Sequence, residues 1–355
     1  MRIQTALTRM VGIEHPVVQT GMGWVAGARL VSATANAGGL GILAAATMTI
    51  DELATAITKV KAATDRPFGV NIRADAADAG DRVDLMIREG VKVASFALAP
   101  NQELIARLKE AGSVVIPSIG AAKHAKKVAA WGADAVIVQG GEGGGHTGPV
   151  ATTLLLPSVL DVLDGTDVAV VAAGGFFDGR GLAAALSYGA AGVAMGTRFL
   201  LTTDSTVPES VKQRYLETGL DGTVVSTRVD GMPHRVLRTG LVEKLESGSP
   251  VRGFTAAILN AAKFKKMSQM SWTSMIRDGL AMRHGKDLTW SQVIMAANTP
   301  MLLKAGLVDG NNDAGVLASG QATGIIEDLP SCEQLIDGIV AEAIKHLQSA
   351  TALID

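Results

Sequence analysis

The chain has 355 residues, of which 48% are hydrophobic and 19% charged, and its formal net charge is −2. This composition excludes an intrinsically disordered chain, and the near-neutral charge argues against a general nucleic-acid binder. The single cysteine, Cys332, has no partner for a disulfide within the chain. A disulfide-stabilised scaffold is therefore excluded, and a reducing, cytoplasmic setting is expected.

No targeting or membrane segment is expected. The chain begins MRIQTALTRM, which lacks the basic region and following apolar region of a secretory signal. Gly, Thr and Ser interrupt the longest apolar stretches well short of the roughly 18 residues that a membrane span needs. We therefore expect no membrane partner.

Short apolar runs recur along the first part of the chain, and each is followed by a helix-like segment. Continuous runs rich in Val, Ile and Ala are typical of buried parallel strands. The predicted strands are Val17–Thr20, Leu40–Ala45, Phe68–Ile72, Val93–Leu98, Val114–Ile119, Ala135–Gln139, Val168–Ala173 and Gly192–Gly196.

The segments between these runs carry helix signals. Thr49 precedes one segment and Glu52 follows three residues later, which is the capping-box pattern. Glycine ends several others, as expected of a helix terminus. The predicted helices are Thr49–Ala63, Asn101–Ala111, Ala121–Trp131, Asp178–Tyr188 and a closing helix over Ser331–Leu347.

Eight strand–helix units predict an α/β fold, a closed (β/α)8 TIM barrel. An open doubly wound sheet is the alternative. It is less favoured because Gly21-Met22-Gly23 after the first strand does not continue into a GxGxxG dinucleotide motif.

The alternation stops after the eighth strand, and residues 205–298 are predicted to be helical. We expect a barrel built from residues 1–204 and 309–355, with residues 205–308 forming an inserted, mainly helical second domain. Between Arg228 and Lys286 there are eleven Lys or Arg residues but four acidic residues, a local charge of +7. This segment predicts either an anionic partner or a solvated helical face.

Glycines end the last two predicted strands, at Gly174-Gly175 and at Gly196-Thr197. The loops after strands seven and eight of a TIM barrel are its usual phosphate site. Glycine lets backbone N–H groups approach a phosphate, and Thr197 can add a hydroxyl donor. Tight turns without a ligand are the alternative.

The densest motif follows the sixth predicted strand, where glycines lead from Gln139 to His146. Open backbone can pass close to a flat ligand, and an imidazole near the barrel mouth suits proton transfer at neutral pH. His234 and His284, in the basic segment, are candidates for substrate contact. No metal site is expected, because Glu142 and His146 give at most two ligands.

Asn71 lies near the end of the third predicted strand, and Gly21 and Met22 directly follow the first. A side-chain amide suits the polar edge of a ring, and methionine offers a soft apolar surface. Packing and turn formation are the alternative for these residues.

Six motifs in order resemble the nitronate monooxygenase (2-nitropropane dioxygenase-like) family over essentially the whole chain. The motifs are Gln19-Thr20-Gly21-Met22, Ala37-Gly38-Gly39-Leu40-Gly41, Phe68-Gly69-Val70-Asn71, Gly143-Gly144-Gly145-His146, Ala173-Gly174-Gly175-Phe176-Phe177-Asp178-Gly179-Arg180 and Met195-Gly196-Thr197-Arg198-Phe199.

The resemblance implies an FMN-dependent TIM barrel whose active-site histidine is His146. It implies that Met22 and Asn71 lie against the isoalloxazine, that Gln139 and Gly144 border it, and that a late loop brings Gln321 back toward it. The full set of implied cofactor-binding residues is Gly21, Met22, Asn71, Ser118, Gln139, Gly144, Gly174, Gly175, Gly196, Thr197 and Gln321.

Two positions depart from some relatives, which carry lysine where this chain has Ser118 and aspartate where it has Gln139. Both lie near the flavin in the family and weigh against quinone-reductase or nitronate activity. The chain is most similar to an actinobacterial branch associated with degradation of the steroid C and D rings through an indane-carboxyl-CoA thioester. The charge of the basic segment fits this independently, because CoA carries several phosphate charges, and the candidate contacts to them are Arg235, Arg238, Lys263, Lys265 and Lys266.

The favoured function is therefore an FMN-dependent α,β-dehydrogenase of a bicyclic, steroid-derived acyl-CoA. Three alternatives stay open: nitronate monooxygenase, NAD(P)H-dependent quinone or enoyl-CoA reductase, and a non-catalytic flavin or acyl-CoA binding protein. The oligomeric state also stays open, including a homo-oligomer.

Overall fold

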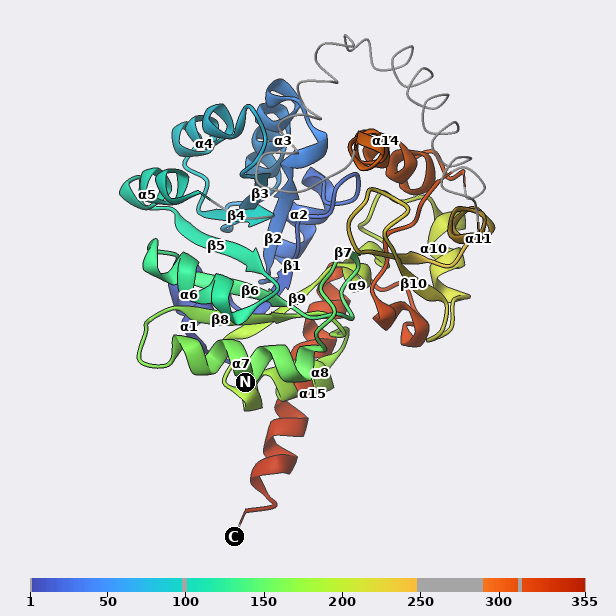
Figure 1. Cartoon of the computed structure of the whole chain (residues 1–355). Helices are drawn as coiled ribbons and strands as arrows, with labels where there is room; N and C mark the ends of the chain where they lie inside the picture. Colours follow the sequence, from blue (N-terminus) through green and yellow to red (C-terminus); the bar gives the residue numbers. More distant parts are fainter. Residues whose placement is uncertain (1, 98–100, 248–289, 312–314, 355) are drawn as a thin grey trace.

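A closed barrel of parallel strands forms the centre of this computed structural model, which describes residues 2–97, 101–247, 290–311 and 315–354 (Figure 1). Pairing of Val17 with Val193 joins the first strand to the last and closes the barrel. The predicted TIM barrel is confirmed, and the open sheet is wrong. The barrel strands are β1 (Val17–Gln19), β2 (Leu40–Ala44), β3 (Gly69–Arg73), β4 (Val93–Ala97), β5 (Val114–Ile119), β6 (Ala135–Gln139), β8 (Ala169–Ala173) and β9 (Gly192–Met195).

The strands are buried on both faces, which is why their sequences are continuous apolar runs instead of alternating ones. All five residues of β2 and all five of β8 are buried. Leu40, Ile42 and Val171 belong to one apolar cluster, and Val70 and Phe96 belong to another. This double burial fixes where each strand ends, and so fixes the loops that follow.

Helices surround the barrel, and the predicted ends are observed within a residue, except that the closing helix predicted over Ser331–Leu347 continues to Thr351. The Thr49 hydroxyl accepts from the backbone of Glu52, whose carboxylate accepts from the backbone of Thr49 in return. Asp178 caps α8 through a single bond of this kind, in which its carboxylate accepts from the backbone of Gly181. The helices of the barrel are α1 (Ala6–Val11), α2 (Ala28–Asn36), η1 (Ala45–Thr47), α3 (Ile50–Ala63), α4 (Ala79–Arg88), α5 (Gln102–Glu110), α6 (Ala122–Ala130), α7 (Thr152–Leu163), α8 (Gly179–Tyr188) and α9 (Thr197–Leu200).

The described part of the predicted insertion contains two strands as well as helices. Its elements are α10 (Glu209–Leu216), β10 (Thr223–Ser226), β11 (His234–Leu237), α11 (Gly240–Ser247) and α14 (Trp290–Leu307). The antiparallel hairpin β10–β11 was not predicted. It pairs with β7 (Gly145–His146), a two-residue strand in the loop after β6, to give a sheet ordered β10-β11-β7. Strand pairing therefore joins the insertion to a barrel loop. The boundaries of the insertion at 205 and 308 stay a prediction.

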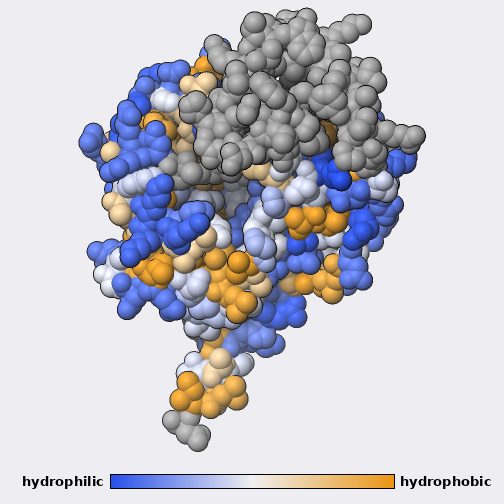
Figure 2. All heavy atoms as spheres, in the orientation of Figure 1, coloured by the Kyte–Doolittle hydropathy of each residue, from blue (hydrophilic) through white to orange (hydrophobic). Residues whose placement is uncertain are grey.

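The chain returns to the barrel through η2 (Gln321–Ile325) and ends in α15 (Cys332–Thr351). The helix α15 packs on α8 and α2, and its carboxyl end projects away from the body of the molecule (Figure 1). Leu353 and Ile354 near this end are exposed. Figure 2 shows hydrophobic surface toward the tip of the projecting helix. No helix among the described residues is both long enough and apolar enough to span a membrane.

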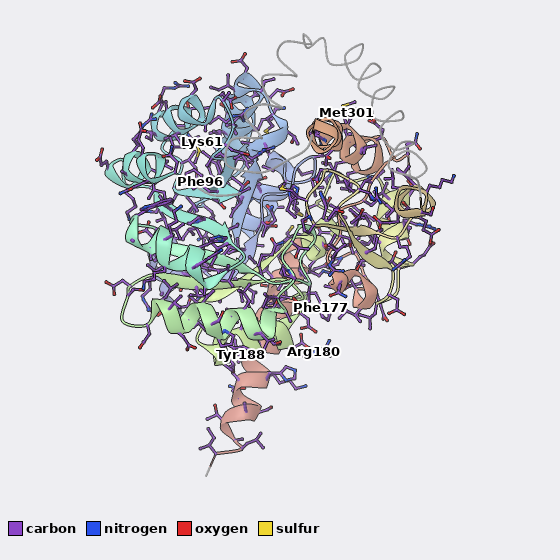
Figure 3. All side chains as sticks on the ribbon, viewed as in Figure 1. Lys61, Phe96, Phe177, Arg180, Tyr188 and Met301 are labelled. Carbon is purple, nitrogen blue, oxygen red and sulfur yellow. The ribbon has the colours of Figure 1, made fainter. Side chains whose placement is uncertain are left out.

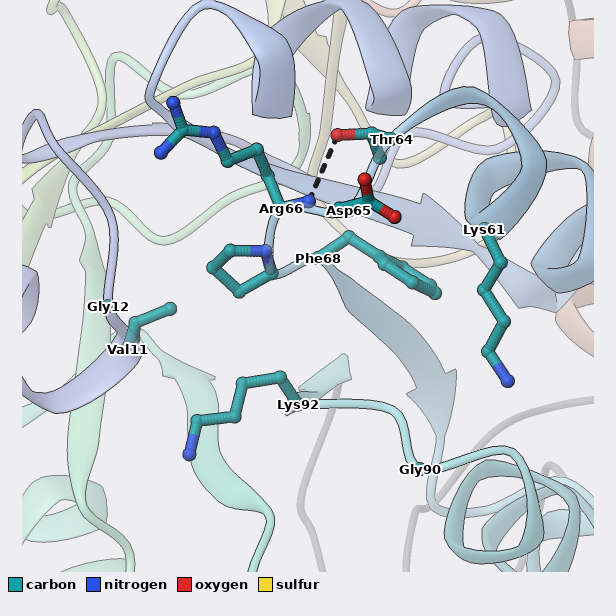
Figure 4. A pocket seen from close by; sticks show the side chains of 10 residues that line it. Val11, Gly12, Lys61, Thr64, Asp65, Arg66, Phe68, Gly90 and Lys92 are labelled. Atoms are coloured by element: carbon teal, nitrogen blue, oxygen red, sulfur yellow. Dashed lines mark hydrogen bonds between the residues drawn. The ribbon is translucent and has the colours of Figure 1, made fainter.

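A cavity of about 440 Å³ lies at the amino ends of β3 and β4 (Figure 4). Its lining includes Lys61, Arg66, Phe68 and Lys92. TIM-barrel active sites lie at the carboxyl ends of the strands, so this cavity is at the opposite end of the barrel from the loops that matter for function.

Candidate active site

The predicted site residues come together at the carboxyl ends of the barrel strands. Met22 follows β1, Asn71 lies in β3, and Gln139 is the last residue of β6. Gly174 and Gly196 directly follow β8 and β9, which pair with each other. Residues from five strands therefore meet around one mouth, as expected of a TIM-barrel site.

The turn after β8 is shaped for close approach of an anion. Gly174 and Gly175 have φ values of 95° and 82°, a region that favours glycine. No acceptor in the described part of the chain takes the N–H of either glycine. Both backbone donors are therefore available to a ligand phosphate, as the fold's usual phosphate site requires.

Two of the first three amides of α8 already have an acceptor within the chain. Gly181 N donates to Asp178, and Gly179 N donates to Oε2 of Glu342 at 2.7 Å. The guanidinium of Arg180 bonds Asp178 and lies 5.7 Å from the ring of Phe177, beside the same turn (Figure 3). The glycine turn therefore offers a phosphate more unpaired backbone donors than the first turn of α8 does.

The turn after β9 adds a second open surface. A methyl group on Gly196 would lie 3.4 Å from Sδ of Met22 and 3.3 Å from Oγ1 of Thr20. A side chain here would fill the space between the β1 and β9 ends. The glycines of both turns therefore fit the phosphate end of a bound flavin, with Met22 beside them.

The late loop that contains Gln321 contacts this region. The backbone N–H of Gly320 donates to Oγ1 of Thr197 at 2.9 Å, and that of Gln321 donates to Glu142 O at 3.0 Å. A methyl group on Gly144 would lie 2.6 Å from Gly320 N. The loops after β6 and β9 and the late loop therefore touch through backbone atoms.

The glycine-rich loop after β6 is anchored at several points. The Glu142 carboxylate accepts from the backbone and hydroxyl of Thr152, at 3.0 and 2.7 Å. Arg235 of β11 donates to Gly141 O at 2.8 Å. Gln139 Nε2 donates to the backbone carbonyl of His146 at 2.8 Å. These contacts fix the loop despite its glycine content.

Asn71 is buried, and its Nδ2 donates to Oγ of Ser95 at 3.1 Å. A methyl group on Gly21 would lie 2.5 Å from Cβ of Asn71, so glycine is needed where the β1 and β3 ends meet. Ser118 lies half-buried on β5, opposite Ile137 of β6. The amide of Asn71 thus has a fixed orientation at the mouth.

His146 lies in β7, directly across from His234 in β11. Its Nε2 is 2.7 Å from Oδ2 of Asp230, and Nδ1 of His234 is 3.1 Å from the same oxygen. The side chain of His146 is 43% exposed, whereas those of Asp230 and His234 are each 3% exposed. One imidazole therefore reaches from a buried carboxylate toward solvent.

Burial alone would raise the pKa of Asp230. Hydrogen bonds from His146 and His234, together with their charges, outweigh burial and lower this pKa well below its ordinary value. The carboxylate of Asp230 is therefore ionised at neutral pH.

These three side chains also offer ligand atoms within 4.8 Å of one another. We interpret them as a hydrogen-bonded set, because 2.7 Å between Nε2 and Oδ2 is a hydrogen-bond length. The expected absence of a metal stays a prediction.

The five predicted CoA-phosphate contacts fall into three groups. Arg235 is half-buried and bonds Gly141 O and Oγ1 of Thr223. Arg238 is exposed, directly after β11. Lys263, Lys265 and Lys266, like His284, lie outside the described residues.

Asp230 and Ser95 were not predicted from the sequence, and His234 was predicted only as a substrate contact. Asp230 and Gly231 do form a turn signal of the kind found between hairpin strands. The partner of Asp230, however, is 84 residues away, and nothing in the local pattern around either residue connects them.

The family model described as nitronate monooxygenase matches residues 4–342 of this chain. The chain belongs to the nitronate monooxygenase family. Proteins of this family and its structural neighbours are flavoproteins in general, and the chain is an oxidoreductase.

Two relatives match nearly the whole chain. A Mycobacterium tuberculosis protein named "(3aS,4S,5R,7aS)-5-hydroxy-7a-methyl-1-oxo-octahydro-1H-indene-4-carboxyl-CoA dehydrogenase" is 82% identical, covering 100% of both chains. A Rhodococcus jostii protein of the same name is 72% identical, covering 99% of each chain. Among solved structures, FabK from Thermotoga maritima has a TM-score of 0.82 and 32% identity, covering 99% of this chain and 100% of its own.

Proposed function

We propose that this member of the nitronate monooxygenase family is an FMN-dependent α,β-dehydrogenase of the bicyclic indene-carboxyl-CoA thioester. The observation that carries the proposal is full-length identity of 82% to a protein named as a dehydrogenase of this acyl-CoA. Identity of 72% to a second protein of that name supports it. The protein would act on this steroid-derived acyl-CoA in the cytoplasm.

The mouth of the barrel supports a bound FMN. Gly174, Gly175, Gly196 and Thr197 would hold its phosphate, because their backbone and hydroxyl donors line two adjacent turns. The residues that would border the ring are Gly21, Met22, Asn71, Ser118, Gln139, Gly144 and Gln321.

In the proposed reaction a side chain of this protein accepts the α-proton of the substrate. Dehydrogenation breaks two C–H bonds of the acyl group and turns one C–C bond into a double bond. The α-hydrogen, acidified by the thioester, leaves as a proton to the imidazole of His146, and the β-hydrogen leaves as hydride. The bound flavin supplies the two-electron oxidant that accepts this hydride.

The experiment is anaerobic mixing of the flavin-loaded protein with the acyl-CoA, with NADH or NADPH, or with a small nitronate, while the flavin's visible absorbance is followed. We expect the acyl-CoA alone to bleach the flavin and to give a product lighter by two hydrogens. Deuterium at the α-carbon should be lost to solvent and deuterium at the β-carbon should slow bleaching.

Other outcomes would overturn the proposal. Bleaching by a nicotinamide but not by the acyl-CoA would favour the reductase alternative, and bleaching by the nitronate alone would favour nitronate oxidation. Binding without bleaching by any of them would favour the carrier. His146→Ala should bind FMN normally and reduce it slowly; full turnover would remove the base assignment.

A further inference from the structure

One oxygen of the Asp230 carboxylate accepts hydrogen bonds from two imidazole rings. Nε2 of His146 lies 2.7 Å from Oδ2, and Nδ1 of His234 lies 3.1 Å from it. The centroids of the two rings are 4.7 Å apart, and the ring planes are tilted by 50°. The proposed reaction gives Asp230 no direct contact with the acyl group, so its function in the site needs a separate explanation.

The backbone holds this carboxylate in place. The second oxygen, Oδ1, accepts from the backbone N–H of Met232 at 3.1 Å. Gly231 takes a φ of 83° in the same turn, and its N–H donates to Thr227 O at 3.0 Å. Asp230 is therefore a fixed, buried, negatively charged acceptor at the end of the β10–β11 hairpin.

The charge of Asp230 decides where the ring protons lie. An ionised carboxylate only accepts hydrogen bonds, so each nitrogen that faces it carries hydrogen. Neutral His146 then has its proton on Nε2 and its lone pair on Nδ1. Neutral His234 has its proton on Nδ1, while its Nε2 is buried with no hydrogen-bond partner among the described residues.

We infer that Asp230 is a positioning residue that fixes His146 in the Nε2–H tautomer, so that Nδ1 is the atom that receives the substrate proton. This inference rests on the proposed function, in which His146 is the base. It adds that Nδ1 is the basic nitrogen and that Asp230 sets the tautomer. When Nδ1 takes the α-proton, the imidazolium lies 2.7 Å from a carboxylate that stabilises its charge. The second hydrogen bond to Oδ2, from His234, fixes the orientation of the carboxylate.

The first test reads the tautomer without any turnover. In ligand-free protein labelled with ¹⁵N-histidine, long-range ¹H–¹⁵N spectra distinguish a protonated ring nitrogen from an unprotonated one. The chain has six histidines, and His146→Gln assigns the signal by removing it. We expect Nε2 of His146 to be protonated and Nδ1 to be unprotonated. The reverse tautomer in the unaltered protein would overturn the inference, whether or not any variant folds.

The second test uses Asp230→Asn, which keeps the shape and removes the charge. We expect the rate of flavin reduction by the acyl-CoA to fall ~10²–10⁴-fold, with KM nearly unchanged. The same variant should mix or reverse the His146 tautomer. A purely structural role would leave the tautomer as it is. Asp309→Asn is the matched control, since this exposed aspartate pairs with Lys304 and not with a histidine.

The two proposals fail in different ways. If His146→Ala reduces flavin at the normal rate, the base assignment of the proposed function fails. If His146→Ala is slow but Asp230→Asn is fast and keeps the tautomer, only the inference about Asp230 fails.

Discussion

Thr197 and Gly320 are 123 positions apart, yet the Thr197 hydroxyl accepts a 2.9 Å hydrogen bond from the Gly320 backbone. Its own hydroxyl proton stays available to a ligand, since one hydroxyl can accept and donate at once. This residue therefore links the late loop to the turn after β9, where we propose that the FMN phosphate binds.

Thr197→Val should weaken FMN binding about 10- to 100-fold, because it removes the acceptor of Gly320 and a donor to the phosphate. Thr197→Ser keeps the hydroxyl and should bind within about threefold of the unaltered protein. Fluorescence titration of FMN into the cofactor-free protein measures both. Equal affinity for the valine and serine variants would count against Thr197 as a phosphate contact.

Gly144→Ala should push the late loop away from the mouth. The added methyl would lie 2.6 Å from Gly320 N, which is backbone and cannot rotate aside. We expect FMN affinity and turnover to fall about tenfold or more. Gly148→Ala in the same loop is the control, since its methyl would lie 3.8 Å from Gly120 O. Two variants with the same affinity would show that the close contact does not matter.

Arg198 is 4% exposed, and it bonds Asp328 and the backbone carbonyls of Leu201 and Asp328. Burial lowers its pKa, and Asp328 opposes that shift. Arg198→Ala should lower the free energy of unfolding by about 2–4 kcal/mol, because it empties a buried site and leaves carbonyls unpaired. Arg88→Ala, at an exposed arginine, should change it by under about 1 kcal/mol. Denaturant unfolding of both variants gives the comparison.

Cys332 is fully buried beside Thr34 and Thr202. Burial raises the pKa of its thiol from 9.0 to about 12, against the hydrogen bond from Thr34. We expect no reaction with a thiol reagent at pH 8 in the folded protein and fast reaction in denaturant. Because the unfolded thiol ionises first as pH rises, the folded state should lose stability from about pH 9 upward. Rapid labelling of the folded protein at pH 8 would contradict this.

Arg238 is the exposed arginine among the described candidates for the CoA phosphates. If it contacts a phosphate, Arg238→Ala should raise KM for the acyl-CoA about 5- to 20-fold and reduce the dependence of KM on salt. Lys92→Ala is the matched control, because it removes one positive charge at the opposite end of the barrel (Figure 4). An equal KM for both variants would remove Arg238 from the binding surface.

The barrel was predictable because its signals are local. Strands buried on both faces are continuous apolar runs, and caps such as Thr49 and Asp178 act within three residues of themselves. Seven of the eight predicted strands can be compared along their whole length, and they match within a residue at each end; the eighth, Val93–Leu98, is described only to Ala97. The glycine turns after β8 and β9 follow from the same strand ends, so their nearness was predictable too.

The environment of His146 was not predictable in the same way. Its partner strand, β11, has four residues and β7 has two, so neither carries a periodic pattern long enough to read. Asp230 is one of only four acids in a basic segment, and its contact with His146 depends on how a hairpin docks on a distant loop. Such contacts exist only in the folded chain.

The three-stranded sheet also restricts how this protein can be re-engineered. Two of its strands come from the insertion and one from the barrel, so the carboxylate and the imidazole that it faces belong to different segments. A chimera that takes only the insertion of another family member would replace Asp230 and His234 while leaving His146 behind. Exchange of substrate preference by grafting therefore has to carry the β7 loop along with the hairpin, as a single module.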